Sequence, residues 1–233
     1  MKKRIAIIPA RGGSKRIPEK NIRNFCGKPM IAYVLEAAKK SGLFHTIHVS
    51  TENEKIKNTV EELGFKIDFL RAAELSGDIT PIMPVLNYVV NEYEKKGEYF
   101  DEVWLLMACS PMLEAEDLIK AAALSDAEGG DKSIIAVSEY PVPIEWALTR
   151  GNDGMMHPTQ PGMFAVRSQD FEKKYFDAGV FVSYPIELIK SASGAGSDMG
   201  KLGFVYPKER TIDIDDEADW KIAEALYQLK FKK

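Results

Sequence analysis

The sequence predicts a three-layer αβα fold with a mainly parallel sheet, built by one domain of 233 residues. Short apolar runs alternate with segments of helical period along most of the chain, a pattern typical of parallel strands covered by helices on both faces. The alternation stops between residues 139 and 178, where four prolines and several aromatic residues follow no clean period. We therefore expect a single domain over 1–233 with a small arm, residues 139–178, protruding from it.

The strands are predicted from short apolar runs that end at prolines or polar residues. The first, RIAIIP, has the continuous apolar character of a buried strand, and TIHVST, VWLLMA and SIIAVS repeat that character. Strands are expected at residues 4–9, 46–51, 103–108, 133–138, 180–185, 203–207 and 211–215.

The helices are predicted from apolar residues spaced at three and four positions. The spacing from Ile31 to Ala38 follows this rule, and Gly64 ends the next such segment. Helices are expected around residues 31–38, 56–63, 82–93, 114–124 and 220–227. The composition of residues 191–200 favours a flexible surface loop.

Composition excludes several functional classes. The net charge of −4 argues against a general nucleic-acid binder. Cys26 and Cys109 match no metal or disulfide spacing, which favours a reduced, cytoplasmic protein. The basic start resembles a signal peptide, but Pro9 and Arg11 interrupt the apolar stretch too early. No run approaches the ~18 apolar residues of a membrane helix, so no membrane partner is expected.

The first strand leads into a Gly-rich and strongly cationic loop, residues 10–21, which we call the basic loop. Ligands in α/β sheets collect at the carboxyl ends of strands, and glycines there let backbone N–H groups approach phosphate. Four cations lie within ten residues: Arg11, Lys15, Arg16 and Lys20. Neither GxxxxGK[ST] nor GxGxxG is present, which argues against a Walker A loop or a dinucleotide site. A solvated turn with scattered charge is the alternative, but this charge density after a buried strand favours phosphate.

The stretch IIPARGGSKRIPEKNI closely resembles the N-terminal signature of the CMP-sialic acid synthetases, the acylneuraminate cytidylyltransferases. The likeness continues through FCGKPMIAY, VSTENEKI, FLRAAELS, RSQDF…YFDAG and TIDIDDEADW, and RSQD with a downstream DAG looks most like the pseudaminic acid branch. The resemblance implies a Rossmann-like nucleotidyltransferase fold and a reaction of CTP with a nine-carbon α-keto acid sugar that gives a CMP-sugar and pyrophosphate. Legionaminic acid, N-acetylneuraminic acid and 3-deoxy-octulosonate remain alternative sugars, and a non-catalytic nucleotide-sugar sensor is an alternative of another class.

The resemblance also implies the nucleotide site. In the family the N-terminal loop holds the CTP triphosphate, which here assigns Ala10, Arg11, Gly12, Gly13, Ser14, Lys15, Lys20 and Asn21 to CTP binding. Arg11 and Lys20 are expected to be catalytic too, because cations stabilise charge moving to pyrophosphate. Arg71 is implied to contact cytosine, with a surface ion pair to Glu74 as the alternative, and Asp78 and Thr80 are implied to face the ribose.

A metal site is predicted near the C-terminus. In a strand at residues 211–215, Asp213 and Asp215 would share one face while Ile212 and Ile214 share the other. Paired hard oxygen ligands at a phosphate site suit Mg²⁺, with Mn²⁺ as a substitute, and the resemblance implies the same metal role. Asp216 and Asp219 have the spacing of a capping box for the following helix.

The sugar site is implied by the resemblance alone, through Ser110, Arg167, Gln169, Asp177 and Gly179. A guanidinium binds a carboxylate bidentately, which makes Arg167 the expected partner of the α-keto acid group. Gln169 and Asp177 are expected to face hydroxyl or amide groups of the sugar. The irregular residues 139–178 resemble the family's dimerisation arm, so a homodimer that shares its active sites is expected.

The remaining reactive side chains receive no catalytic role. Cys109 is interpreted as a small core residue, and His45, His48 and His157 have neither metal nor triad spacing. No side chain is an evident general base, so a metal-bound hydroxide and one of the aspartates both remain open.

Overall fold

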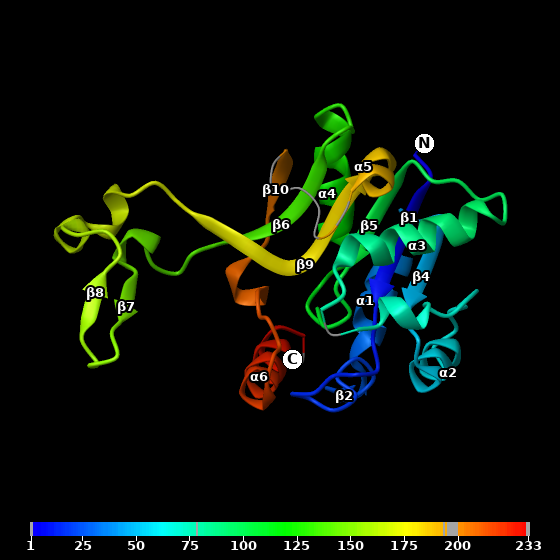
Figure 1. Ribbon diagram of the computed structural model, residues 1–233, viewed down its shortest axis with the longest axis horizontal. Coiled ribbons are helices and arrows are strands. Elements are labelled where there is room, and N and C mark those ends of the chain that lie inside the picture. The colour runs from blue at the N-terminus through cyan, green and yellow to red at the C-terminus, as the bar shows by residue number, and fades with distance from the viewer. Residues whose placement is uncertain (1, 78, 193, 195–199, 232–233) are drawn as a thin grey trace.

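The computed structural model describes residues 2–77, 79–192, 194 and 200–231. Within them a six-stranded sheet forms the centre of the molecule, in the order β10-β6-β9-β5-β1-β4 (Figure 1). Its strands are β1 (Arg4–Pro9), β4 (Thr46–Ser50), β5 (Glu102–Leu106), β6 (Ser133–Glu139), β9 (Tyr175–Pro185) and β10 (Lys201–Val205). All neighbours are parallel except β9, which runs antiparallel to both β5 and β6, so the predicted mainly parallel sheet is confirmed.

Helices cover both faces of this sheet, which confirms the three layers. On one face α1 (Met30–Ser41), α2 (Glu54–Glu62) and α4 (Ala115–Ala127) pack against Ala6 and Ile8 of β1. On the other, α3 (Ile82–Glu94) and α5 (Ile186–Ser191) pack against Ile5 and Ile7. The alternating side chains of one fully buried strand thus supply both cores.

The C-terminal helix α6 (Glu217–Phe231) forms a third, smaller cluster with the end of the basic loop. Trp220 of α6 contacts Phe25 edge to face at 5.4 Å between ring centroids. Phe25 lies in the short pair β2 (Asn24–Phe25) and β3 (Lys28–Pro29). Short 3-10 helices lie at Ala73–Leu75, Ile144–Trp146, Met163–Ala165, Ser168–Asp170 and Lys208–Arg210.

The strand predicted at residues 211–215 is wrong. These residues, which we call the acidic segment, belong to no strand, because other groups occupy their hydrogen-bonding positions. Lys20 Nζ donates to the carbonyl oxygen of Ile214 at 2.5 Å, and Asp219 Oδ2 accepts from the backbone N–H of Asp215 at 2.9 Å. The segment is nonetheless extended enough to keep the predicted alternation, since Ile214 is buried while Asp213 is exposed.

The other predicted strands and helices are confirmed to within a few residues, apart from β9. That strand starts at Tyr175 rather than at residue 180, because its first residues pair with the end of β6. Helix α5 was not predicted. Most of the loop predicted at 191–200 lies outside the described residues.

The chain leaves the sheet between β6 and β9 to form the arm, which projects to one side of the body (Figure 1). The arm spans residues 140–174 rather than the expected 139–178, because Glu139 belongs to β6 and residues 175–178 belong to β9. The arm contains a hairpin of β7 (Leu148–Arg150) and β8 (Met156–Pro158). It has a small aromatic cluster of its own, in which the rings of Trp146 and Phe164 stack with centroids 6.3 Å apart. No described helix is long and apolar enough to cross a bilayer.

Candidate active site

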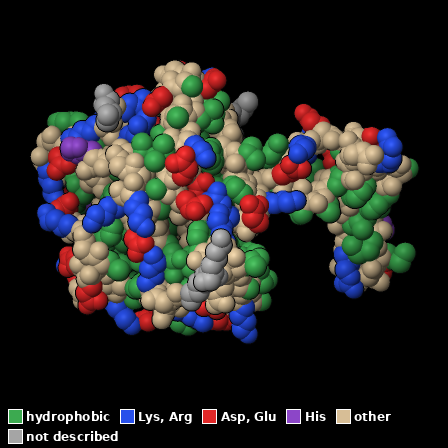
Figure 2. All heavy atoms as spheres, turned by 180° about the vertical axis from the view of Figure 1, so that it is seen from behind, with side chains coloured by type: hydrophobic (Ala, Val, Ile, Leu, Met, Phe, Trp, Pro, Cys, Tyr) green, Lys and Arg blue, Asp and Glu red, His purple; other side chains and the backbone are tan. Residues whose placement is uncertain are grey.

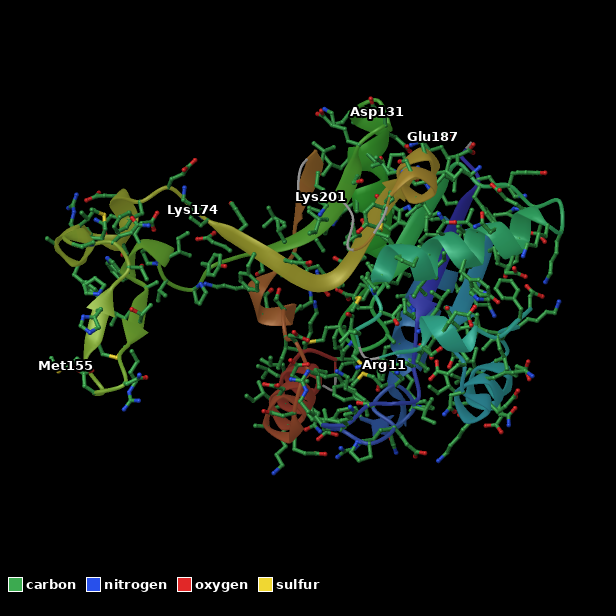
Figure 3. The ribbon with its side chains drawn as sticks, viewed as in Figure 1. Arg11, Asp131, Met155, Lys174, Glu187 and Lys201 are labelled. Atoms are coloured by element: carbon green, nitrogen blue, oxygen red, sulfur yellow. The ribbon has the colours of Figure 1, made fainter. Side chains whose placement is uncertain are left out.

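A cavity of about 490 Å³ opens where the carboxyl ends of β1 and β5 meet. This is the edge at which α/β sheets collect their ligands. The cavity wall includes the basic loop, Arg71, the start of α3, the residues after β5, Gly179 of β9 and the acidic segment. Figure 3 shows Arg11 in the body of the molecule, away from the arm that carries Met155.

The basic loop rests on the turn between β4 and α2. Ala10 N–H donates to Ser50 O at 2.9 Å, and Gly12 N–H donates to Glu52 Oε1 at 2.7 Å. A Cβ on Gly12 would lie 2.3 Å from the Asn53 side chain, so any other residue there would require Asn53 or the basic loop to shift. The backbone N–H of Gly12, which we expected to face CTP, instead donates its hydrogen bond to Glu52.

Several predicted CTP residues do line the cavity together: Arg11, Ser14, Lys15, Lys20 and Asn21. Asn21 closes the base of the loop, since its Nδ2 donates to Arg11 O at 3.0 Å. Gly13 has open space around the position of a Cβ. Three positive side chains and a serine hydroxyl therefore converge on one space, as a polyphosphate requires.

Asp213 and Asp215 line the same cavity. Although Asp213 as a residue is exposed, its carboxyl is partly shielded from water by the cavity wall; this partial burial raises the pKa of the carboxyl, and the neighbouring negative charge of Asp215 adds to the shift. Asp215 lies close to two cations: Arg16 Nη2 donates to Asp215 Oδ1 at 2.7 Å, and Lys20 Nζ lies 4.0 Å from the same oxygen. Two hard oxygen donors that repel each other beside a phosphate-type site fit a divalent cation.

The capping box predicted at the start of α6 is confirmed. Asp216 Oδ1 accepts from the N–H groups of Ala218 and Asp219 at 2.8 and 3.0 Å. Asp219 Oδ2 accepts in return from the N–H groups of Asp215 and Asp216 at 2.9 and 3.1 Å. The cap therefore anchors the backbone of Asp215 directly to the helix.

Arg71 is buried, with 8% of its surface exposed, and lines the cavity. Its Nε donates to Ser50 Oγ at 3.0 Å and its Nη2 donates to Ser50 O. Burial lowers the pKa of the guanidinium; the nearby Glu52 charge opposes this shift and the Arg11 charge adds to it. A surface pair with Glu74 is not among the contacts of the described residues.

The expected sugar residues separate into two groups. Gly179 lines the cavity; its N–H donates to Asp177 Oδ1 at 2.9 Å and its carbonyl accepts from Ser110 Oγ at 3.3 Å. Arg167 and Gln169 lie on the arm, outside the cavity of their own chain. Arg167 donates to both carboxylate oxygens of Asp170, at 2.8 and 3.0 Å.

Of the expected ribose residues, Thr80 lines the cavity and Asp78 lies outside the described residues. Cys109, expected in the core, also lines the cavity, where its Sγ lies 3.4 Å from Asn21 Oδ1. Burial raises the pKa of the Cys109 thiol to about 11, so the thiol stays protonated at neutral pH. His48 is structural as expected, buried against Tyr93.

Glu52 and Ser50 were not expected to be part of the site, and Arg16 was expected only as one of the four cations of the basic loop. Ser50 ends β4 and Glu52 follows it within the stretch VSTENEKI, but no local spacing points to their partners, since the contacts of Glu52 with Gly12 and of Ser50 with Arg71 span 40 and 21 positions. Within the described residues no group of three or more His, Cys, Asp or Glu side chains is placed to hold a metal. The metal site predicted at Asp213 and Asp215 thus has two carboxylates and remains a prediction.

A family model described as cytidylyltransferase matches residues 5–138. A pseudaminic acid cytidylyltransferase of Campylobacter jejuni is 32% identical over 227 residues, with 97% of each chain covered. A CMP-N,N'-diacetyllegionaminic acid synthase of Legionella pneumophila is 28% identical over 232 residues, covering 97% of this chain and 96% of the relative.

Among solved structures, a CMP:2-keto-3-deoxy-manno-octonic acid synthetase complexed with CTP superposes with a TM-score of 0.71 at 17% identity, over 98% of this chain and 100% of that one. At this identity the likeness shows the fold. The matched family model covers more than half of the chain and the Campylobacter relative nearly all of it, and the chain belongs to the cytidylyltransferase family.

Proposed function

We propose that the protein transfers CMP from CTP to a nine-carbon α-keto acid sugar of the pseudaminic acid type and releases pyrophosphate. The observation that carries this proposal is the convergence of the basic loop and the Asp213–Asp215 pair on one cavity. The substrate class is taken from the Campylobacter relative, which nearly the whole chain matches. Legionaminic acid is the second candidate sugar, because the Legionella relative is matched over a similar length.

In this reaction the anomeric hydroxyl of the sugar attacks the α-phosphorus of CTP, and the bond from the α-phosphorus to the bridging oxygen breaks. Negative charge then moves onto the leaving pyrophosphate. Arg11, Lys15 and Lys20 line the cavity and are the side chains that would bind the triphosphate and stabilise this charge. A triphosphate carries about four negative charges, which the three cations offset in large part.

Asp213 and Asp215 are proposed to hold Mg²⁺, or Mn²⁺ in its place. Burial raises the pKa of the Asp213 carboxyl and the charge of Asp215 adds to the shift; a divalent cation would relieve the repulsion between the two carboxylates. When bound, such a cation would lower the pKa of the attacking hydroxyl and offset phosphate charge. The capping box holds the backbone of Asp215 fixed for this task.

Arg71 is proposed to bind the cytosine. Two of its nitrogens are held by Ser50, and Nη1 makes no hydrogen bond among the described residues while the side chain lines the cavity. A guanidinium fixed in this way can donate to the acceptor atoms of a base without losing side-chain entropy on binding. Thr80 lines the same wall and remains the proposed ribose contact.

The arm is proposed to join two subunits in a homodimer. Figure 2 shows hydrophobic side chains on the arm, and Val142, Met155 and Phe164 are each more than half exposed. Exposed apolar clusters of this kind mark interaction surfaces. In such a dimer Arg167 and Gln169 would reach the sugar in the partner's cavity, as they do not line their own. The two cysteines, Cys26 and Cys109, match no metal or disulfide spacing, and on this ground we propose a cytoplasmic location.

The experiment is pyrophosphate release with CTP across a panel of nine-carbon and eight-carbon keto sugars. The expected result is the highest kcat/KM with pseudaminic acid and much slower release with 3-deoxy-octulosonate. If none of the sugars in the panel supports pyrophosphate release although the protein binds CTP measurably, the result would instead support the nucleotide-sugar sensor.

A further inference from the structure

The basic loop and the acidic segment are joined by an ion pair inside the cavity. Arg16 Nη2 donates to Asp215 Oδ1 at 2.7 Å, although 199 positions separate the two residues. Arg16 lines the cavity together with both carboxylates of the acidic segment. The guanidinium therefore bridges the part of the cavity that would hold phosphate and the part that would hold metal.

This contact competes with metal binding. A divalent cation of the Mg²⁺ type approaches a carboxylate oxygen to about 2.1 Å, and would have to share the Asp215 carboxylate with Arg16, which already donates to Oδ1. It would also bring two positive charges next to the guanidinium charge. Arg16 and a metal ion on Asp215 are therefore mutually unfavourable unless Arg16 moves.

Arg16 can move at small cost. Its side chain is 65% exposed and that of Asp215 is 41% exposed, and exposed ion pairs contribute little to stability. A triphosphate in the basic loop offers the guanidinium several anionic oxygens in place of one carboxylate oxygen, and a guanidinium matches phosphate geometry bidentately.

We propose that Arg16 couples nucleotide binding to metal binding: it neutralises Asp215 in the free enzyme, and CTP draws it away and opens Asp215 to the cation. The proposal rests on the proposed function, because it takes CTP and a divalent cation as the ligands of this cavity. It makes Arg16 a positioning residue and predicts that CTP and metal bind with positive cooperativity. By linkage, each ligand then raises the affinity for the other by the same factor.

A matched control lies next to this pair. Arg23 Nη1 and Nη2 donate to the carboxylate of Glu217 at 2.5 and 3.1 Å, so a second arginine just beyond the basic loop pairs with a carboxylate at the start of α6. Neither residue lines the active-site cavity. Arg23→Gln therefore removes one arginine charge and one ion pair of the same kind without touching the carboxylates proposed for the metal.

The test is direct Mn²⁺ binding, measured by electron paramagnetic resonance without sugar, for the wild type and for Arg16→Gln, Arg23→Gln and Asp215→Asn. Each protein is titrated with and without CTP, and the Mn²⁺–CTP complex in solution is titrated separately. Arg16→Gln is expected to bind Mn²⁺ about fivefold more tightly than wild type when CTP is absent, the size expected of an exposed ion pair. CTP should then raise its Mn²⁺ affinity about fivefold less than it raises that of the wild type.

The outcomes separate the coupling from the function beneath it. If the wild type, Arg16→Gln and Arg23→Gln bind Mn²⁺ with equal affinity when CTP is absent, the coupling is overturned. If Asp215→Asn nevertheless fails to bind Mn²⁺, the metal assignment stands. A tighter site in both arginine variants also overturns it, because the effect is then one of general charge. If Asp215→Asn binds Mn²⁺ like the wild type, the metal assignment fails and the coupling fails with it.

Discussion

Lys20 Nζ lies 4.0 Å from Asp215 Oδ1 and donates to the carbonyl of Ile214, the residue before that aspartate. One lysine of the basic loop thus fixes the position of a carboxylate near the other end of the chain. It also lines the cavity with Arg11 and Lys15. Lys20 is therefore placed both to bind phosphate and to hold the acidic segment.

Lys20→Glu is expected to weaken CTP binding at least tenfold and to lower kcat at least tenfold, because it replaces a phosphate-facing cation with a second negative charge beside Asp215. CTP affinity is measured by isothermal titration and turnover by pyrophosphate release. Lys40→Glu, at an exposed position near the end of α1, makes the same charge change and should leave both unchanged. Wild-type turnover in Lys20→Glu would show that the basic loop is not the triphosphate site.

Gly12→Ala is expected to displace the basic loop, because the new Cβ would lie 2.3 Å from Asn53 Nδ2. The predicted readout is a rise in the KM for CTP of about tenfold or more. Asn53→Ser shortens the obstructing side chain but keeps a residue able to cap α2. The double variant Gly12→Ala/Asn53→Ser should recover most of the lost affinity, and no recovery would mean that the clash with Asn53 is not the cause.

Replacing residues 141–173 of the arm by Asn-Gly is expected to give a folded monomer. Glu139 and Tyr175 are paired across β6 and β9, and Tyr140 N–H donates to Lys174 O, so a two-residue turn can close the ladder there. Sedimentation velocity should show a dimer for the full chain and a monomer for the shortened one, which should keep CTP binding and lose sugar transfer. A full-length protein that is monomeric and fully active would contradict the dimer.

His48 is expected to make the fold sensitive to acid. Burial lowers the pKa of His48 from 6.5 to about 3, with the charges of Lys96 and Arg71 adding to the shift. The unfolded chain therefore binds a proton below pH 6.5 that the folded chain excludes, and stability is lost as pH falls from 6.5 toward 3 at about 1.4 kcal/mol per pH unit. Between pH 7.5 and 5.0, urea unfolding should show the wild type losing about 2 kcal/mol more than His48→Gln. Equal losses would mean that the buried imidazole is protonated in the folded state.

The sequence predicted those parts of the fold that depend on local pattern. For β1 and α1 the spacing of apolar residues needs only to distinguish a strand from a helix, and both elements lie where the spacing predicts them. The acidic segment shows the limit, because the alternation of Asp213 and Ile214 was correct while the strand was not. Alternation reports which side chains face the core, and says nothing of whether a neighbouring strand is present to pair with the backbone.

The parts of the site that were missed depend on contacts between distant segments. Glu52 lies in the stretch VSTENEKI, but nothing in that stretch indicates that its carboxylate accepts from the N–H of Gly12, 40 positions away. In the sequence Arg16 is one of four cations in the basic loop, and only the fold shows that it pairs with Asp215. Such partners are set by the packing of α6 against the loop after β1, which no local spacing encodes.

The most direct test of the proposed function is turnover in single-aspartate variants of the acidic segment. Asp213→Asn and Asp215→Asn each remove one of two repelling charges, so both should keep the fold. Each should lower kcat at least tenfold, about 1.4 kcal/mol of barrier or more, with a smaller effect on CTP affinity. Asp216→Asn is the control, because asparagine caps α6 about as well as aspartate.

The measurement is pyrophosphate release with CTP, the preferred sugar and Mg²⁺, with and without chelator, for these three variants and the wild type. We expect chelator to abolish turnover, Asp213→Asn and Asp215→Asn to be at least tenfold slower than the wild type, and Asp216→Asn to stay near the wild-type rate. Loss of catalysis in Asp216→Asn alone, with Asp213→Asn and Asp215→Asn active, would contradict the assignment of the catalytic carboxylates.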